Sequence, residues 1–149
     1  MPRTMVHPDR TAPEFSPEFR CTFRHGGRDV AWVRAAGELD IAAAPELVRT
    51  LGLVEDRARR VVLDLRELTF IDAFGVHVIV DADERARSIG RQLLLVRGPS
   101  QVDRMLALTR AHERLTMVHL NPAEPPVQAL VQIAARERAH ERRWRTASG

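Results

Sequence analysis

The residues with types and spacing suited to chemistry or binding lie in one short stretch, Asp72-Ala73-Phe74-Gly75. An apolar run of strand length precedes it, and a helical pattern follows it. Asp72 is placed to accept the N–H groups that the first turn of a helix leaves unpaired. Such a turn can bind an anion, hold a catalytic group or simply reverse the chain. The function of the protein depends on which of these it does.

The rest of the sequence gives little sign of catalysis. No serine or cysteine has a histidine partner in a recognisable motif, and no glycine-rich phosphate loop follows a strand. The six histidines lack the spacing of metal ligands. The single cysteine, Cys21, forms neither a disulfide nor a cysteine metal cluster within the chain. We therefore predict a non-enzymatic protein with no cofactor and no metal site.

Two elements must position the Asp72 turn. Residues 61–65 are apolar except for Asp64, which predicts a strand covered on both faces, as in a parallel sheet flanked by helices. Asp64 is either tolerated near the strand end or bonded to a neighbour. After the turn, the spacing of Val76, Ile79, Val80 and Asp83 predicts a helix to about residue 89, ended by Gly90.

Flanking patterns predict the remaining elements. Strands are expected at 20–24, 30–35, 92–96 and 115–120, with a hairpin turn at 25–28. Residues 37–40 should end the second strand, with Gly37 serving backbone geometry. One helix should begin with Pro45 in its first position, and another should run from an N-cap at Ser100 to about residue 110. Expected to face inward are Leu47, Val48, Leu51 and Val54 in the first of these helices, and Val102, Met105, Leu106 and Thr109 in the second. Expected on the solvent side are Glu46, Arg49, Glu55 and Asp56.

This order predicts an α/β fold. It has a mixed, mostly parallel sheet of about five strands, with helices mainly on one face. Residues 1–19, with four prolines, are expected to be a flexible lead-in, and residues 20–120 the domain. Residues 121–149 are expected to be a linker and a charged helix. That helix, at 127–143, has an apolar stripe of Val127, Leu130, Val131 and Ala134. Three roles for it remain open: it packs on the core, it pairs two chains in a homodimer, or it protrudes.

Charge is concentrated in the C-terminal tail. Residues 136–145 hold five arginines and two glutamates, a surplus equal to the net charge of +3 of the whole chain. A near-neutral body argues against a dedicated nucleic-acid surface. No apolar run approaches the roughly 20 residues of a membrane span, and the N-terminus has no signal-peptide core. We therefore expect a cytoplasmic protein with no membrane span and no nucleic-acid partner. A solvated helix face is the favoured interpretation of the basic tail, and binding to nucleic acid or to an acidic membrane surface is its alternative.

Several segments, in order and spacing, resemble STAS domains, and among them most closely the bacterial anti-sigma-factor antagonists. Residues 37–40 with 44–47 resemble the family's first loop and helix. Residues 61–72 with 75–76 resemble its central strand and switch loop, and residues 91–96 with 102–108 its closing strand and third helix. The resemblance spans roughly residues 20–120.

The resemblance implies a binding switch in transcription regulation. In the family, a serine directly after the loop aspartate is phosphorylated by a partner that is both serine kinase and anti-sigma factor. The unphosphorylated antagonist binds that partner and frees the sigma factor, and the phosphorylated form lets go. Here Ala73 occupies the serine position, so the switch cannot be modified there. Thr69 is the nearest hydroxyl, but it is expected at the strand end.

The resemblance implies partner contacts at this turn. Capping by Asp72 without a partner role, and folding of Phe74 onto the core, are the structural alternatives. His77 replaces a small residue of the family and brings a titratable group to the presumed contact surface. A STAS scaffold or accessory subunit of a transporter or stress-signalling assembly, and a small-ligand sensor, are the alternative functions. The expected partner-binding residues are Glu38, Asp40, Asp72, Ala73, Phe74, Gly75 and His77.

Overall fold

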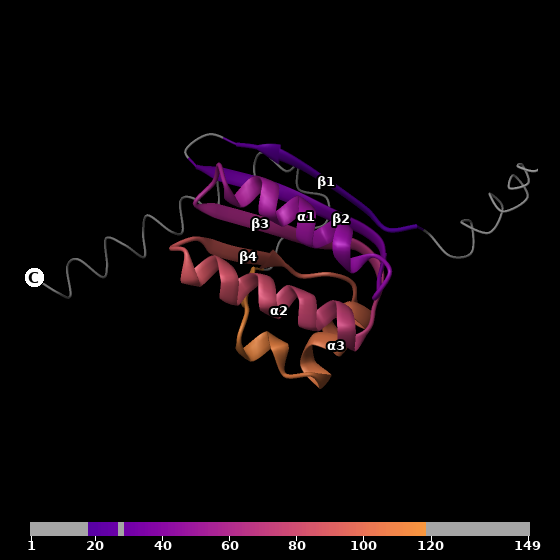
Figure 1. Ribbon diagram of the computed structural model, residues 1–149. Helices are drawn as coiled ribbons and strands as arrows, with labels where there is room; N and C mark the ends of the chain where they lie inside the picture. The colour runs from indigo at the N-terminus through magenta and orange to yellow at the C-terminus, as the bar shows by residue number, and fades with distance from the viewer. Residues whose placement is uncertain (1–17, 27–28, 119–149) are drawn as a thin grey trace, which may run out of the picture.

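The computed structural model describes residues 18–26 and 29–118 of the 149-residue chain. Four predicted segments lie wholly or partly outside the described residues: the lead-in up to residue 17, the second half of the turn at 25–28, the last two residues of the strand at 115–120, and the linker and helix after residue 120. The described chain forms one five-stranded sheet in the order β1-β2-β3-β4-β5 (Figure 1). The strands are β1 (Arg20–His25), β2 (Val30–Leu39), β3 (Arg60–Ile71), β4 (Gln92–Val96) and β5 (Thr116–Val118).

The sheet is mixed and mostly parallel. β1 pairs antiparallel with β2, as a short hairpin requires. The pairs β2–β3, β3–β4 and β4–β5 are all parallel, because a helical segment separates the two strands of each pair along the chain. The predicted α/β fold is confirmed. All four parallel strands therefore end at the same edge of the sheet, where the Asp72 turn lies.

Three helices pack on one face of the sheet: α1 (Ala44–Glu55), α2 (Ala73–Ser88) and α3 (Ser100–Leu108). A short 3-10 turn, η3 (Ala111–Glu113), follows α3 and was not predicted. In Figure 1, α1 and α2 run side by side across the sheet, and α3 lies beyond α2. The main core forms between them and the sheet, and includes Leu47 and Leu51 from α1, Ile79 from α2, Leu106 from α3 and Leu63 from β3.

Two strands are longer than their apolar runs predicted. β2 continues from residue 35 to Leu39, and β3 continues from residue 65 to Ile71. Two register shifts in the β2–β3 ladder, between Arg34 and Ala36 and between Gly37 and Glu38, break the alternation while pairing continues. Gly37 has φ +91, which supports the prediction that it serves backbone geometry. These extensions carry both strands to the edge of the sheet where the Asp72 turn lies.

Several helix details differ from the predictions. Pro45 takes the second helical position instead of the first, and Pro99, not Ser100, is the N-cap of α3. Val48 is exposed, as is Thr109, whose hydroxyl donates to the Met105 carbonyl at 2.9 Å. The helix ends at Leu108, so Thr109 lies beyond its inward-facing stripe.

Glu55 was predicted on the solvent side of α1 but is buried. Its carboxylate Oε1 lies 3.3 Å from Nη2 of Arg85 on α2. Glu55 lies four residues after Leu51, so helix geometry places it beside the apolar stripe of α1. Its charge suggested the solvent side, because the guanidinium that pairs with it comes from a helix thirty residues later. The ion pair therefore joins the last turn of α1 to α2.

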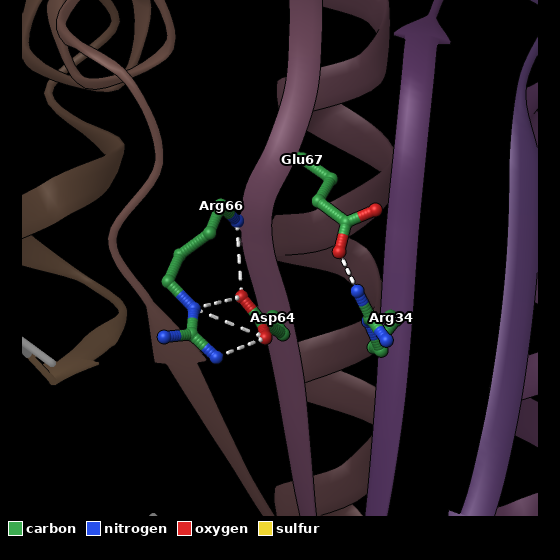
Figure 2. Close-up of polar contacts among 4 residues, drawn as sticks. All are labelled: Arg34, Asp64, Arg66 and Glu67. Carbon is green, nitrogen blue, oxygen red and sulfur yellow. Dashed lines mark hydrogen bonds and ion pairs between the residues drawn. The ribbon is translucent and has the colours of Figure 1, made fainter. Parts of the chain in front are cut away.

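The other face of the sheet carries a second, smaller cluster of buried side chains, all from strands. Asp64 points to this face and is bonded to a neighbour, which settles the alternatives for it. Its carboxylate accepts from the backbone N–H of Arg66 at 3.0 Å and from the Arg66 guanidinium at 2.9 to 3.2 Å (Figure 2). The guanidinium in turn lies 5.8 Å from the ring centre of Trp32. Figure 2 also shows the ion pair between Arg34 on β2 and Glu67 on β3.

Asp83 on α2 gives the stability of the protein a predictable pH dependence. Burial raises the pKa of its carboxyl above the usual 3.8, against the opposing effect of Arg87, whose Nε lies 3.0 Å away. The stability that this raised pKa contributes is fully present below the unfolded-state pKa and is lost as pH rises through the folded-state pKa. We therefore expect Asp83→Asn to gain stability relative to the unmodified chain from about pH 3 to about pH 6, measured by urea unfolding.

Asp81→Asn is the matched control for this trend. Asp81 is exposed on the same helix, so its replacement removes one carboxylate without changing the buried pair. Equal pH slopes for the two variants would contradict the assignment of the trend to Asp83.

Candidate functional site

The Asp72 turn joins the end of β3 to the start of α2. Asp72 is the N-cap, with extended backbone (φ −103, ψ 179), and its Oδ1 accepts from the N–H of Gly75 at 2.8 Å. The predicted capping role is therefore confirmed. The backbone N–H of Asp72 also donates to the carbonyl of Leu39 at 3.3 Å, which joins the ends of β3 and β2. Asp72 is therefore hydrogen-bonded both to the first turn of α2 and to the end of β2.

Gly75 is buried, and the turn needs it because of close packing. A Cβ atom at this position would lie 2.6 Å from the Leu39 carbonyl oxygen and 2.9 Å from Cγ1 of Ile71. Both distances are shorter than any ordinary contact of a Cβ atom. Gly75 therefore lets the first turn of α2 approach the end of β2. Because Gly75 is buried, it can affect a binding surface only by fixing the position of the turn.

Ala73, Phe74 and His77 form an exposed face on the first turns of α2. His77 lies four residues after Ala73 and three after Phe74, so its side chain neighbours both of theirs on the helix surface. Phe74 does not fold onto the core: 46% of it is exposed. Exposed aromatic side chains are over-represented at the centres of protein interfaces. The geometry thus favours a contact role for Phe74 over a packing role.

Glu38 and Asp40 lie beside this face but line a separate hollow. Oδ1 of Asp40 accepts from the N–H groups of Ala42 and Ala43, both at 3.1 Å, and so shapes the entry into α1. Glu38 and Asp40, with Glu18 and Glu46, border a shallow hollow of about 320 Å³. The structure therefore brings the predicted residues to one edge of the sheet in two adjoining groups, linked by the Leu39–Asp72 hydrogen bond.

Two further apolar side chains at this edge were missed by the sequence analysis. Ile41, directly after Asp40, is 64% exposed, and Phe70, two residues before Asp72, is 45% exposed. Phe70 pairs with Glu38 in the ladder, after the register shift at Gly37–Glu38. The apolar run of β3 gives no signal for its exposure, because the shift decides which way Phe70 points. With Phe74, three exposed apolar side chains thus come from the segments that end or begin at this edge.

The described residues offer no metal constellation at this edge. Within 18–26 and 29–118, no three His, Cys, Asp or Glu side chains are grouped so that they could hold a metal ion. Over the same residues, no helix has the length and apolar character needed to cross a membrane. What the described residues gather at this edge is exposed apolar side chains and carboxylates.

Comparison with protein-family models gives a match to the STAS domain over residues 25–124. The chain belongs to the STAS domain family. The matched region overlaps the domain predicted at 20–120 and contains every residue of the candidate site. No curated protein sequence matches the chain.

Solved structures share the fold of this STAS domain at low sequence identity. Unphosphorylated Bacillus SpoIIAA, an anti-sigma factor antagonist, is 14% identical, with a TM-score of 0.63 over 78% of this chain and 97% of that one. An anti-sigma factor antagonist from Mycobacterium paratuberculosis is 20% identical, with a TM-score of 0.64 over the same shares. A putative anti-sigma factor antagonist from Thermotoga maritima is 20% identical, with a TM-score of 0.60 over 76% of this chain and 94% of that one.

The capping hydrogen bond of this STAS domain can be tested separately from any partner. Asp72→Ala is expected to lower the free energy of unfolding by about 1 kcal/mol, because the N–H of Gly75 loses its acceptor. Asp72→Asn, which keeps a capping oxygen, should be nearly neutral. Urea unfolding at neutral pH measures both. Equal losses in the two variants would mean that the negative charge, and not the hydrogen bond, supplies the stability.

Proposed function

We propose that this STAS domain is an anti-sigma-factor antagonist-like protein that binds a kinase-type anti-sigma factor through the Asp72–Gly75 turn. The observation that carries the proposal is the exposure of Ala73 and Phe74 on the first turn of α2, beside the Asp72 cap. This is the place where the family resemblance puts the switch residue and the partner contact. The fold shared with anti-sigma factor antagonists supports the proposal.

The proposed mechanism is competition. The partner would hold a sigma factor until this protein occupies it, and the sigma factor would then be released to transcription. Phe74, together with Ile41 and Phe70, supplies apolar area for the contact, and Asp72, Glu38 and Asp40 supply charge that selects the partner's surface. Such an activity belongs in the cytoplasm, where the sigma factor acts.

Ala73 makes the contact insensitive to the partner's kinase. A phosphate brings nearly two negative charges, and next to Asp72 in an interface it would be repelled and poorly solvated. Ala73 has no hydroxyl to receive one. Thr69 lies on β3, where its backbone carbonyl accepts from Nε2 of Gln101 on α3, so it is set apart from the helix face that carries Ala73. We infer that expression, a ligand or another subunit, and not phosphorylation, controls binding.

The test combines purified protein with candidate kinase-type anti-sigma factors, with and without ATP. The unmodified chain should bind in both conditions and gain no phosphate by mass spectrometry. The matched variant Ala73→Ser should bind without ATP, and with ATP should gain one phosphate at residue 73 and dissociate. Phosphate on the unmodified chain within residues 70–76 would contradict the insensitivity. Failure of every such partner to bind would contradict the proposed function.

A further inference from the structure

Part of the face of the sheet opposite the helices, over β2, β3 and β4, is buried, although no described helix packs on it. Toward β1 this face is open, and the side chain of Arg34 is 42% exposed. Its buried side chains all come from strands, whereas α1, α2 and α3 contribute theirs to the other cluster. Each is at most 5% exposed. Within residues 18–26 and 29–118, therefore, only strands build this second cluster, and yet its side chains are shielded from water. Its members are Val30, Trp32, Val62, Leu94 and Val96.

An ion pair on the same face is shielded as well. The side chain of Asp64 is 5% exposed, and that of its partner Arg66 only 12%. Charged side chains on a sheet face that is open to water extend into the solvent and are seldom buried so far. In Figure 2 both side chains stand out from the same stretch of β3. Their burial is a second sign that this face is covered.

We propose that residues 127–134 form a helix that docks on the second face of the sheet within the same chain. Val127, Leu130, Val131 and Ala134 recur at positions i, i+3, i+4 and i+7, which makes one apolar stripe on a helix. An isolated helix of this length is marginal in water, so the stripe needs a surface to pack on. The second face offers an apolar surface on which none of the described helices packs.

The connection is long enough for this docking. The described chain ends in β5 at Val118, whose side chain is already packed against the second cluster. Eight residues, 119–126, then lead to the segment, and a chain of that length spans up to roughly 26 Å. β5 and β3 are two strand spacings apart, about 10 Å. The chain therefore leaves the sheet beside the surface that it is proposed to cover.

The size of the segment also fits. Eight helical residues are about 12 Å long. The cluster runs from β2 to β4, which is again two strand spacings, about 10 Å. The STAS match ends at residue 124, so the docking helix is an addition to the family domain. It covers an apolar patch that would otherwise favour association with other chains. This inference is independent of the proposed function.

The fluorescence of Trp32, which lies in the second cluster, tests whether residues 127–134 shield that cluster from water. The chain has two tryptophans, so Trp144→Phe leaves Trp32 as the only one. In that background, Leu130→Glu puts a charge into the stripe, and Gln132→Glu, the matched control, puts the same charge on the opposite side of the helix. We expect acrylamide to quench Trp32 several-fold more strongly in Leu130→Glu, with red-shifted emission, and equally in Gln132→Glu and the background chain. Equal quenching in all three would overturn the proposal.

Hydrogen exchange of the unmodified full-length chain tests the proposal without any variant. The amides of residues 127–134 should exchange at least 100-fold more slowly than an unstructured chain, at every protein concentration, with sedimentation showing a monomer. Rapid exchange would overturn the docking even if Leu130→Glu failed to fold. Protection that is lost on dilution, together with a dimer in sedimentation, would overturn it in favour of a second copy of the chain as the occupant.

Discussion

Ala73→Asp is expected to weaken binding to a kinase-type anti-sigma factor by at least tenfold. The new carboxylate would lie on the exposed first turn of α2, next to the carboxylate of Asp72. In the complex both charges would lose water without gaining a partner, and an unpaired charge buried in an interface costs about 2–5 kcal/mol. A tenfold loss corresponds to about 1.4 kcal/mol, so the expectation is a lower bound. Isothermal titration with the purified partner measures it.

Two controls separate this electrostatic effect from damage to the turn. Ala73→Asn has nearly the same shape without the charge, and should lose much less affinity. The thermal unfolding temperature of Ala73→Asp should be equal to or slightly above that of the unmodified chain, because a carboxylate in the first turn of a helix is favoured by the helix dipole. Unchanged affinity in Ala73→Asp would mean that this turn is not the contact surface.

Local patterns predicted the parts of this site that local interactions determine. The Asp72 cap is an interaction between residues three apart, and the sequence shows both the cap and the glycine that donates to it. The strand at 92–96 was predicted with its observed bounds, because a continuous apolar run between turn residues has one interpretation. The family resemblance added the expected role of residue 73, which no periodicity indicates.

Long-range interactions decided what the sequence patterns missed. Glu55 is buried because Arg85 comes to it from α2, and no property of α1 alone indicates that partner. Phe70 pairs with Glu38 near the turn because β2 and β3 extend beyond their apolar runs through two register shifts. Residues at the functional edge therefore depend on the register of two strands, and single-sequence alternation does not fix a register across a bulge.

Gly75→Ala is expected to lower the free energy of unfolding by roughly 1–3 kcal/mol, even though alanine is the better helix former by about 1 kcal/mol. The added methyl group would lie 2.6 Å from the Leu39 carbonyl oxygen, which is backbone and already accepts from the N–H of Asp72. To make room, α2 must move away from the end of β2. That movement stretches the Leu39–Asp72 hydrogen bond and displaces the turn, so affinity for the partner should fall as well.

Gly52→Ala is the matched control, because Gly52 lies inside α1 and a Cβ atom there would meet nothing within 4 Å. The same chemical change should therefore raise the free energy of unfolding by about 0.5–1 kcal/mol. Urea unfolding of both variants compares the two glycines directly. Opposite signs would show that Gly75 is held by the close approach of α2 to β2. Stabilisation by both substitutions would mean that this approach is relaxed in solution, and that the turn does not depend on Gly75 for its position.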